Sequence, residues 1–197
     1  MPLSEDFVKG VAARAETAVV VLGRAAGEDR DCLLQEGSYY LKAEERNMLA
    51  LAKKYFKKLV VLLNIGNIID FSWVAEFSPN AVLLLWQGGM ETGNACAKLL
   101  SGAVSPSGKL TMTIAKRYED YPASNFGDAS HTDYTEDNYV GYRYFETFAK
   151  EQVRYPFGYG LSYTTFSVDP SLTYAQQGAE ICVKVKNTGK CAGRCAV

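Results

Sequence analysis

The stretch Leu59–Asn64 (Leu-Val-Val-Leu-Leu-Asn) decides the fold, because it is a short apolar run without polar alternation. Such a run is typical of a strand buried on both faces of a parallel sheet. Ala18–Gly23 (Ala-Val-Val-Val-Leu-Gly) and Ala81–Trp86 (Ala-Val-Leu-Leu-Leu-Trp) have the same character. Helical patterns over Glu44–Phe56 and Glu91–Leu100 alternate with these runs. This order predicts an α/β fold, with a mostly parallel sheet covered on both faces by helices.

The C-terminal third has a different pattern. Ser105–Leu110 is a turn that leads into a short predicted strand, Thr111–Ile114, and residues 117–138 form a long polar loop of a length that is usually functional. Glu180–Asn187 alternates polar and apolar residues, which predicts a half-exposed antiparallel strand. About 30 residues cannot close a β-sandwich. We therefore expect an α/β domain over 1–165 and the first strands of a truncated sandwich over 166–197.

Composition excludes several classes of function. The chain has 197 residues and a net charge of −1, so nothing in its charge favours nucleic acid or an anionic membrane surface as a partner. No apolar run has the length of a membrane span, and no signal peptide precedes the first helix, so we expect a cytoplasmic protein. The five cysteines are an odd number without metal-ligand spacing. They are expected to be free thiols, and we expect neither a metal nor a cofactor.

Thr135–Phe145 (Thr-Glu-Asp-Asn-Tyr-Val-Gly-Tyr-Arg-Tyr-Phe) places acidic side chains beside several aromatic ones, and Tyr155–Tyr163 adds more. Aromatic rings stack on the apolar faces of sugars, and a carboxyl group held against them loses water, which favours its protonated form. This environment suits a proton donor to a glycosidic oxygen. Glu136 is the first candidate for that role, with Asp133 and Asp137 as alternatives. The alternation of Tyr139, Tyr142, Tyr144 and Phe145 suggests a strand here.

A second group of polar residues follows the first strand. Glu28, Asp29 and Arg30 come soon after Ala18–Gly23, and Trp86 ends a later strand. The carboxyl ends of parallel strands meet at one edge of a sheet, which is where ligands bind in such folds. Paired acceptors and a forked donor suit the vicinal hydroxyls of a sugar, and Trp86 could stack on its ring. An Asp–Arg pair that only organises the loop, and a tryptophan that belongs to the core, are the structural alternatives.

Several short motifs occur together in a particular order, and their order is more specific than any one of them. With them the chain resembles the C-terminal α/β domain of family 3 glycoside hydrolases, the β-glucosidase family, running into the fibronectin type III-like domain that follows it. The resemblance covers about residues 5–190 and is carried by Gly27–Arg30, Trp86–Gly89, Gly93–Ala95, Ser105–Leu110, Tyr155–Tyr163 and Asn187–Gly189.

The resemblance implies a retaining β-glycosidase whose acid/base is a glutamate five residues before the glycine of Val-Gly-Tyr-Arg. That position is Glu136, because the glycine is Gly141. The family usually has glycine next, where this chain has Asp137. The family's nucleophile is an aspartate on a separate (β/α)8 barrel domain, and nothing in this sequence resembles that domain. The resemblance thus implies one part of an enzyme whose partners are a small β-glycoside or oligosaccharide and the barrel of the same parent enzyme.

Two other classes of function stay open. The missing barrel is also compatible with a non-catalytic carbohydrate-binding or interaction module. A nucleotide-binding α/β protein is the third interpretation, prompted by the glycines Gly23 and Gly27 after a strand. That interpretation is weak, because neither the Gly-x-Gly-x-x-Gly nor the Lys-Ser/Thr fingerprint of a phosphate-binding loop is present.

Overall fold

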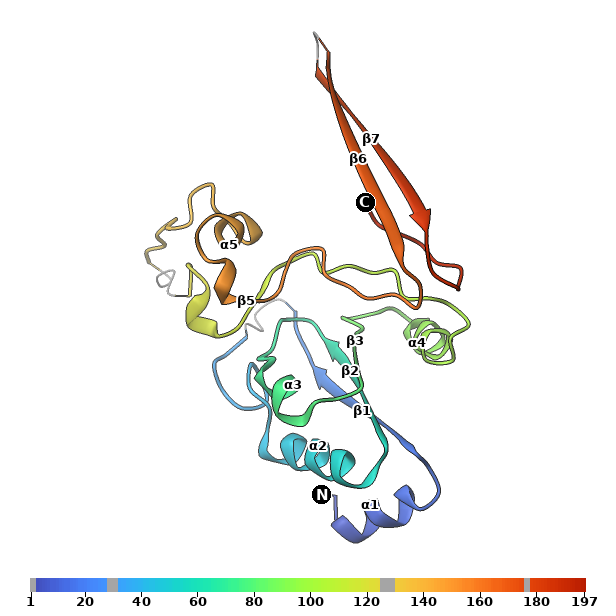
Figure 1. The fold of residues 1–197 in the computed structure, drawn as a ribbon. Helices are drawn as coiled ribbons and strands as arrows, with labels where there is room; N and C mark the ends of the chain where they lie inside the picture. The colour runs from blue at the N-terminus through green and yellow to red at the C-terminus, as the bar shows by residue number, and fades with distance from the viewer. Residues whose placement is uncertain (1–2, 28–31, 125–129, 176–177) are drawn as a thin grey trace. The chain divides into compact units, whose positions relative to one another are not determined.

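The structure is a computed structural model that describes residues 3–27, 32–124, 130–175 and 178–197. The chain divides into two units (Figure 1), and each is described by itself. The first comprises Met1–Thr92 and Lys116–Ser124, and the second comprises Gly93–Ala115 and Asn125–Val197. Within the described ranges, no helix combines the length and the hydropathy that crossing a membrane requires.

The first unit contains the predicted parallel sheet. Its strands are β1 (Thr17–Arg24), β2 (Lys58–Ile65) and β3 (Ala81–Leu84), in the order β1-β2-β3. β1 pairs with β2 in parallel from Thr17↔Lys58 to Arg24↔Ile65. The α/β class with a mostly parallel sheet is therefore confirmed, although β3 ends at Leu84, two residues earlier than predicted.

The central strand is buried as the sequence predicts, but β1 is not. On β2, the side chains of Leu59, Val61 and Leu63 are at most 1% exposed. On β1, burial alternates, and Val19 and Val21 are 48% and 56% exposed. The expectation of a sheet covered on both faces is thus wrong for β1 in the described chain. The reason is that β1 is an edge strand here, so an apolar run alone did not distinguish it from the central strand.

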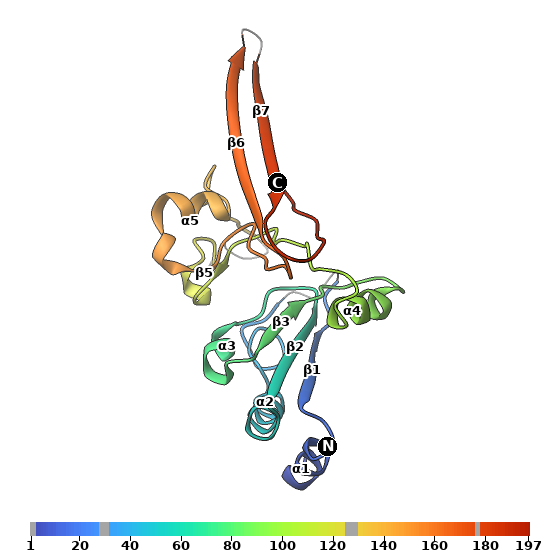
Figure 2. The same ribbon diagram turned by 45° about the vertical axis from the view of Figure 1, so that its right-hand side comes forward.

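Three helices accompany this sheet. α1 (Glu5–Ala12) begins at Ser4, whose hydroxyl accepts a hydrogen bond of 3.3 Å from the Phe7 N–H, as expected for an N-cap. α2 (Ala43–Tyr55) and α3 (Ser72–Phe77) lie beside the same side of the strands in Figure 2. Leu49 of α2 and Trp73 of α3 are completely buried. A short 3₁₀ helix, η1 (Tyr118–Asp120), completes the unit.

The second unit is built around a short antiparallel pair. β4 (Ile114–Ala115) pairs with β5 (Val153–Tyr155), so the predicted strand 111–114 is confirmed only at its last residue. The pairing continues irregularly beyond the strands, because the Leu110 N–H donates to the Tyr159 carbonyl at 2.8 Å. α4 (Thr92–Leu100) precedes this region and is followed by Gly102, which has a φ of +77°.

The aromatic segment after Val140 is helical, which corrects the strand suggested by its alternation. Its residues form α5 (Tyr142–Phe148), followed by the 3₁₀ helix η2 (Lys150–Gln152). Phe145 and Ala149 are buried, and their spacing of four residues is that of a helix face. Alternating tyrosines imitated the period of a strand, but they are largely exposed and do not direct the packing.

The chain ends in a long antiparallel hairpin of β6 (Phe166–Ala175) and β7 (Gly178–Asn187), which is prominent in Figure 1. The predicted strand Glu180–Asn187 lies within β7. Apolar residues face each other across one side, as in Val168↔Val185 and Leu172↔Ile181. Leu172 and Ile181 are 50% and 69% exposed, so this hairpin is exposed on both sides rather than half-buried.

Candidate active site

Glu136 lies in a turn of the second unit, between an extended segment and α5. The Asp137 N–H donates to the Tyr134 carbonyl at 3.3 Å, and the Tyr139 N–H donates to the Glu136 carbonyl at 2.7 Å. Between residues 131 and 140, Glu136 is the one residue whose side chain is partly buried, while all the others are exposed. Among the acidic residues of this segment, Glu136 is therefore the least exposed.

The turn is connected to α5 through two contacts. The Arg143 guanidinium donates a hydrogen bond of 3.0 Å from Nη1 to the Asn138 carbonyl. The ring of Tyr139 meets that of Phe148 edge to face, with 4.8 Å between the centroids. The Tyr139–Phe148 contact thus helps to attach the turn to the helix.

The two alternative acids are in different situations. Asp133 accepts a 2.8 Å contact from the His131 ring, and both side chains are well exposed. Asp137 is exposed and has a φ of +47°, a left-handed conformation that favours glycine and, among other residues, asparagine and aspartate. The family's usual glycine at this position therefore has a conformational reason, and aspartate is one of the few substitutes that fit.

Of the predicted binding residues, the structure describes Trp86, which is in the first unit. Glu28, Asp29 and Arg30 lie outside the described residues. Trp86 follows β3 by two residues, is partly buried and has a φ of +56°. A bulky residue is rarely found in this left-handed conformation, and such outliers concentrate at functional sites. The structure brings Trp86 to the carboxyl end of the sheet, as the sequence predicts.

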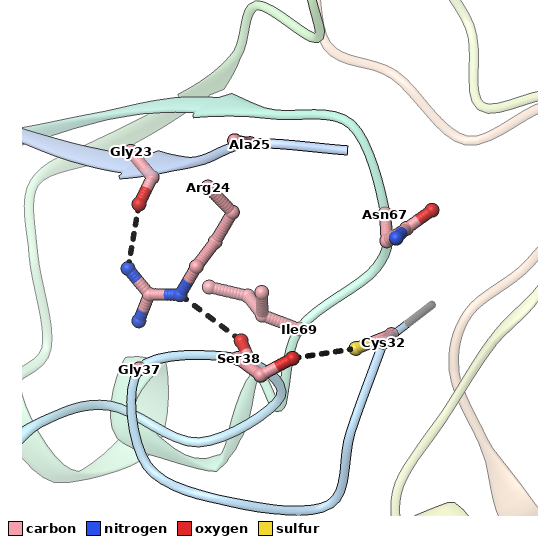
Figure 3. Close-up of a pocket in the computed structure, with 8 residues that line it drawn as sticks. All are labelled: Gly23, Arg24, Ala25, Cys32, Gly37, Ser38, Asn67 and Ile69. Atoms are coloured by element: carbon pink, nitrogen blue, oxygen red, sulfur yellow. Dashed lines mark hydrogen bonds between the residues drawn. The ribbon is translucent and has the colours of Figure 1, made fainter. Parts of the chain in front are cut away.

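A small pocket opens at the carboxyl ends of β1 and β2 (Figure 3), with a volume of about 230 Å³. Gly23 and Ala25 line it from the end of β1, Asn67 from the segment after β2, and Cys32 and Ser38 from the intervening loop. Its volume is below the roughly 300–1,000 Å³ of ordinary small-molecule sites. The pocket marks the edge where ligands bind in this fold class.

Arg24, which also lines the pocket, has a structural role that sequence analysis missed. It contacts Glu45 with two hydrogen bonds of 2.7 Å, and the two side chains are only 8% and 17% exposed. Its other N–H groups reach the carbonyls of Gly23, Ser38 and Tyr40. An arginine has five N–H donors, and all five are engaged within the protein. Arg24 therefore has no donor left for a ligand.

The electrostatics of Glu45 follow from this pair. Burial alone would raise the pKa of its carboxyl group, but the hydrogen bonds from Arg24 and from the Lys42 N–H outweigh that effect and hold the pKa below its usual range. The charged pair joins the end of β1 to the start of α2. The sequence alone does not reveal this pair, because acidic residues such as Glu45 are common in the first turn of a helix.

Comparison with known proteins gives the same family from sequence and from structure. Residues 4–163 match the model of the glycosyl hydrolase family 3 C-terminal domain. The chain is 48% identical to a β-glucosidase of Ruminococcus albus over 195 residues, which are 98% of this chain and 21% of that protein. It is 42% identical to β-glucosidase A of Butyrivibrio fibrisolvens over 194 residues, which are 85% of this chain and 23% of the relative.

Solved structures agree with this relationship. A β-glucosidase from Paenibacillus barengoltzii superimposes with a TM-score of 0.90 at 46% identity, over 96% of this chain and 21% of that one. β-Glucosidase 3B from Thermotoga neapolitana also gives 0.90, at 36% identity, over 97% of this chain and 28% of that structure. The chain thus spans roughly a fifth to a quarter of the length of these relatives. It belongs to glycoside hydrolase family 3 and contains that family's C-terminal domain.

Proposed function

We propose that this chain supplies the general acid/base of a retaining β-glycosidase, and that Glu136 is the residue concerned. The observation that carries the proposal is the environment of Glu136, the one residue of intermediate exposure between residues 131 and 140, in a turn attached to aromatic side chains. The match to β-glucosidases over nearly the whole chain supports β-glucosides or similar small glycosides as substrates.

In the proposed reaction, a carboxylate of another domain attacks the anomeric carbon of the sugar. The bond from that carbon to the leaving oxygen breaks, and protonated Glu136 gives its proton to this oxygen. Glu136, now a carboxylate, then takes a proton from a water molecule as the water oxygen attacks the anomeric carbon. The covalent sugar–enzyme bond breaks, the sugar leaves with retained configuration, and Glu136 is again protonated.

The nucleophile and most of the substrate contacts belong, in this proposal, to a barrel domain of the same enzyme. Glu28, Asp29 and Arg30 are proposed to bind sugar hydroxyls, and Trp86 to contact a sugar face. The left-handed backbone of Trp86 supports its role, since it departs from what packing alone requires. Arg24 is excluded from binding, because its donors are already engaged.

The test compares two substrates of an active enzyme that contains this chain together with its barrel. Glu136→Ala should lower turnover of methyl β-glucoside by about 10²–10⁴-fold, because methanol leaves only with a proton. With 2,4-dinitrophenyl β-glucoside, whose leaving group needs no proton, bond breaking should stay nearly as fast. Azide, which attacks without base assistance, should then restore turnover and yield a glucosyl azide.

The two neighbouring acids provide matched controls. Asp133→Ala and Asp137→Asn remove exposed carboxylates from the same segment, and asparagine tolerates the left-handed backbone of residue 137. Neither variant should produce this dependence on the leaving group. Unchanged turnover of methyl β-glucoside by Glu136→Ala would overturn the proposal. If sugar binding persists while no acid in this segment affects catalysis, the chain is a non-catalytic carbohydrate-binding module.

We also propose that residues 166–197 open a second, fibronectin-like β-sandwich. The support is the β6–β7 hairpin. On one side of it, apolar residues pair in register and are exposed, as expected for strands whose partner sheet in a sandwich is absent. Extending the chain beyond Val197 by the following strands of a relative should bury Leu172 and Ile181. An unchanged accessibility of cysteine probes introduced at these two positions would contradict this boundary.

A further inference from the structure

The turn that carries Glu136 is not part of a helix or a strand, so its orientation depends on a few specific contacts. Two backbone hydrogen bonds close the turn, and Asp137 adopts a left-handed conformation within it. These interactions shape the turn locally, but they do not fix its position relative to the rest of the second unit. A contact from outside the turn must do so.

Arg143 makes such a contact. It lies in the first turn of α5, and its Nη1 donates to the carbonyl of Asn138, two residues after Glu136, at 3.0 Å. A hydrogen bond from a charged donor is stronger than one between neutral groups. Because the acceptor is a backbone oxygen, the contact controls the path of the chain rather than one mobile side chain.

The arginine is itself held in place by neighbouring aromatic rings. Its guanidinium lies 5.7 Å from the centroid of the Tyr142 ring, within the range of a cation–π contact. Tyr142 in turn stacks on Phe157, with 4.7 Å between centroids and 30° between the planes. A continuous series of contacts therefore leads from Phe157 in the Tyr155–Tyr163 segment, through Tyr142 and Arg143, to the turn that carries Glu136.

We infer that Arg143 is a positioning residue, which sets the direction of the Glu136 carboxyl group by holding the Asn138 carbonyl. This inference rests on the proposed function of Glu136. A proton donor must lie within hydrogen-bond reach of the departing oxygen, and small misplacements reduce the rate strongly. Replacing Arg143 should consequently affect catalysis in the same way as replacing Glu136, but less strongly. It should not act through a general loss of stability.

The experiment uses an active enzyme that contains this chain and measures kcat and KM for methyl and 2,4-dinitrophenyl β-glucosides. Arg143→Met keeps an unbranched apolar stem but removes the donors, and should lower kcat for the methyl glucoside by about tenfold or more. For the dinitrophenyl glucoside, kcat/KM should change little, because this ratio reports on the step that breaks the glycosidic bond and that step needs no proton donor. Azide should restore any loss of its kcat that arises in hydrolysis of the sugar–enzyme bond. Arg143→Lys keeps one donor for the carbonyl and should recover much of the loss.

Lys150→Met is the matched control, because Lys150 is a cation in η2, just after α5, whose ion pair is with Glu146 and not with the turn. It should leave both substrates unaffected. If Arg143→Met does not fold, Tyr142→Leu decides the question, since it keeps Arg143 but removes the ring beneath its guanidinium. It should show the same leaving-group dependence to a smaller extent.

The results separate the two levels of the proposal. Equal losses on both substrates in the arginine variant, or no loss on either, overturn the positioning role of Arg143. If Glu136→Ala, measured in parallel, shows leaving-group dependence, the proposed function of Glu136 survives that result. If Glu136→Ala lacks it, the proposed function itself fails, whatever the arginine variant does.

Discussion

The Oγ atoms of Ser105 and Ser162 lie 2.8 Å apart, although 57 positions separate the two residues in the sequence. Ser105 also accepts a hydrogen bond from the Tyr163 N–H at 3.0 Å, and the Tyr163 hydroxyl donates to the Leu99 carbonyl at 2.8 Å. The Lys109 ammonium reaches the Gly160 carbonyl in the same region. Ser105–Leu110 and Tyr155–Tyr163, two of the motifs on which the family resemblance rests, are thus in contact with each other. This contact explains several of their residue types.

Gly160 is the tightest point of this contact, which leads to a first prediction. A Cβ atom at Gly160 would lie 2.5 Å from the Gly108 carbonyl oxygen, so Gly160→Ala must displace backbone. Overpacking of this kind typically costs about 1–3 kcal/mol of folding free energy. Urea denaturation should show that loss. Gly108→Ala is the control, because a Cβ there meets nothing within 4 Å. Equal stabilities of the two variants would show that the contact is not tight.

A second prediction concerns the pair of Arg24 and Glu45. Glu45→Gln leaves the guanidinium of Arg24 largely buried without a countercharge. Removing one partner of such a pair costs about 3 kcal/mol. Thermal or urea unfolding of the chain measures this loss. Glu44→Gln is the matched control, since Glu44 is exposed and shares the first turn of α2, so any effect of the helix dipole is common to both. A loss no larger than that of the control would mean that the pair contributes nothing.

The same pair predicts how stability depends on pH. The folded-state pKa of Glu45 is lowered from its usual 4.5 by Arg24 and the Lys42 N–H, which outweigh burial. A carboxyl group of this kind stabilises the fold fully above its unfolded pKa, and the contribution is lost as the pH falls through the folded pKa. The wild-type chain should therefore lose stability on acidification below about pH 4.5 more steeply than Glu45→Gln. Parallel slopes in urea titrations across this range would contradict the assignment.

A fourth prediction concerns the backbone at Asp137. Since its φ is +47°, Asp137→Gly should relieve part of the strain of the left-handed conformation, whereas Asp137→Ala should add to it. We expect the glycine variant to be more stable than the alanine variant by about 1 kcal/mol, as judged from the difference in unfolding midpoints. An alanine variant as stable as the glycine variant would mean that the turn relaxes out of this conformation.

Much of the first unit was predictable from the sequence, because buried parallel strands and capped helices leave local patterns. Leu59–Asn64 lies within β2, and the helical pattern over Glu44–Phe56 corresponds to α2 (Ala43–Tyr55). The exposed face of β1 was not predictable, since an edge strand and a central strand can have the same composition. α5 was misread because exposed tyrosines alternate by chance with the period of a strand, while Phe145 alone has its side chain fully buried within it.

The candidate site was predictable in part and for a different reason. The position of Glu136 in a turn beside aromatic residues follows from the local sequence and from the family resemblance. The contact from Arg143 to the Asn138 carbonyl does not, because it depends on the helical conformation of residues 142–148. The five-donor arrangement of Arg24 was also hidden, since Glu45 and Tyr40 approach it only after the chain has folded.

The β6–β7 hairpin has ten pairs of residues in register, but within the part of the chain that the structure describes no layer of side chains covers either of its surfaces. Cross-strand hydrogen bonds alone give an isolated two-stranded ribbon little stability in water. In the 197-residue chain its backbone amides should therefore exchange their protons with solvent much faster than those of β2, and through local opening rather than global unfolding. The slowest-exchanging amides should report on β2 alone, so the hairpin and the sheet would behave as separate cooperative segments of one polypeptide.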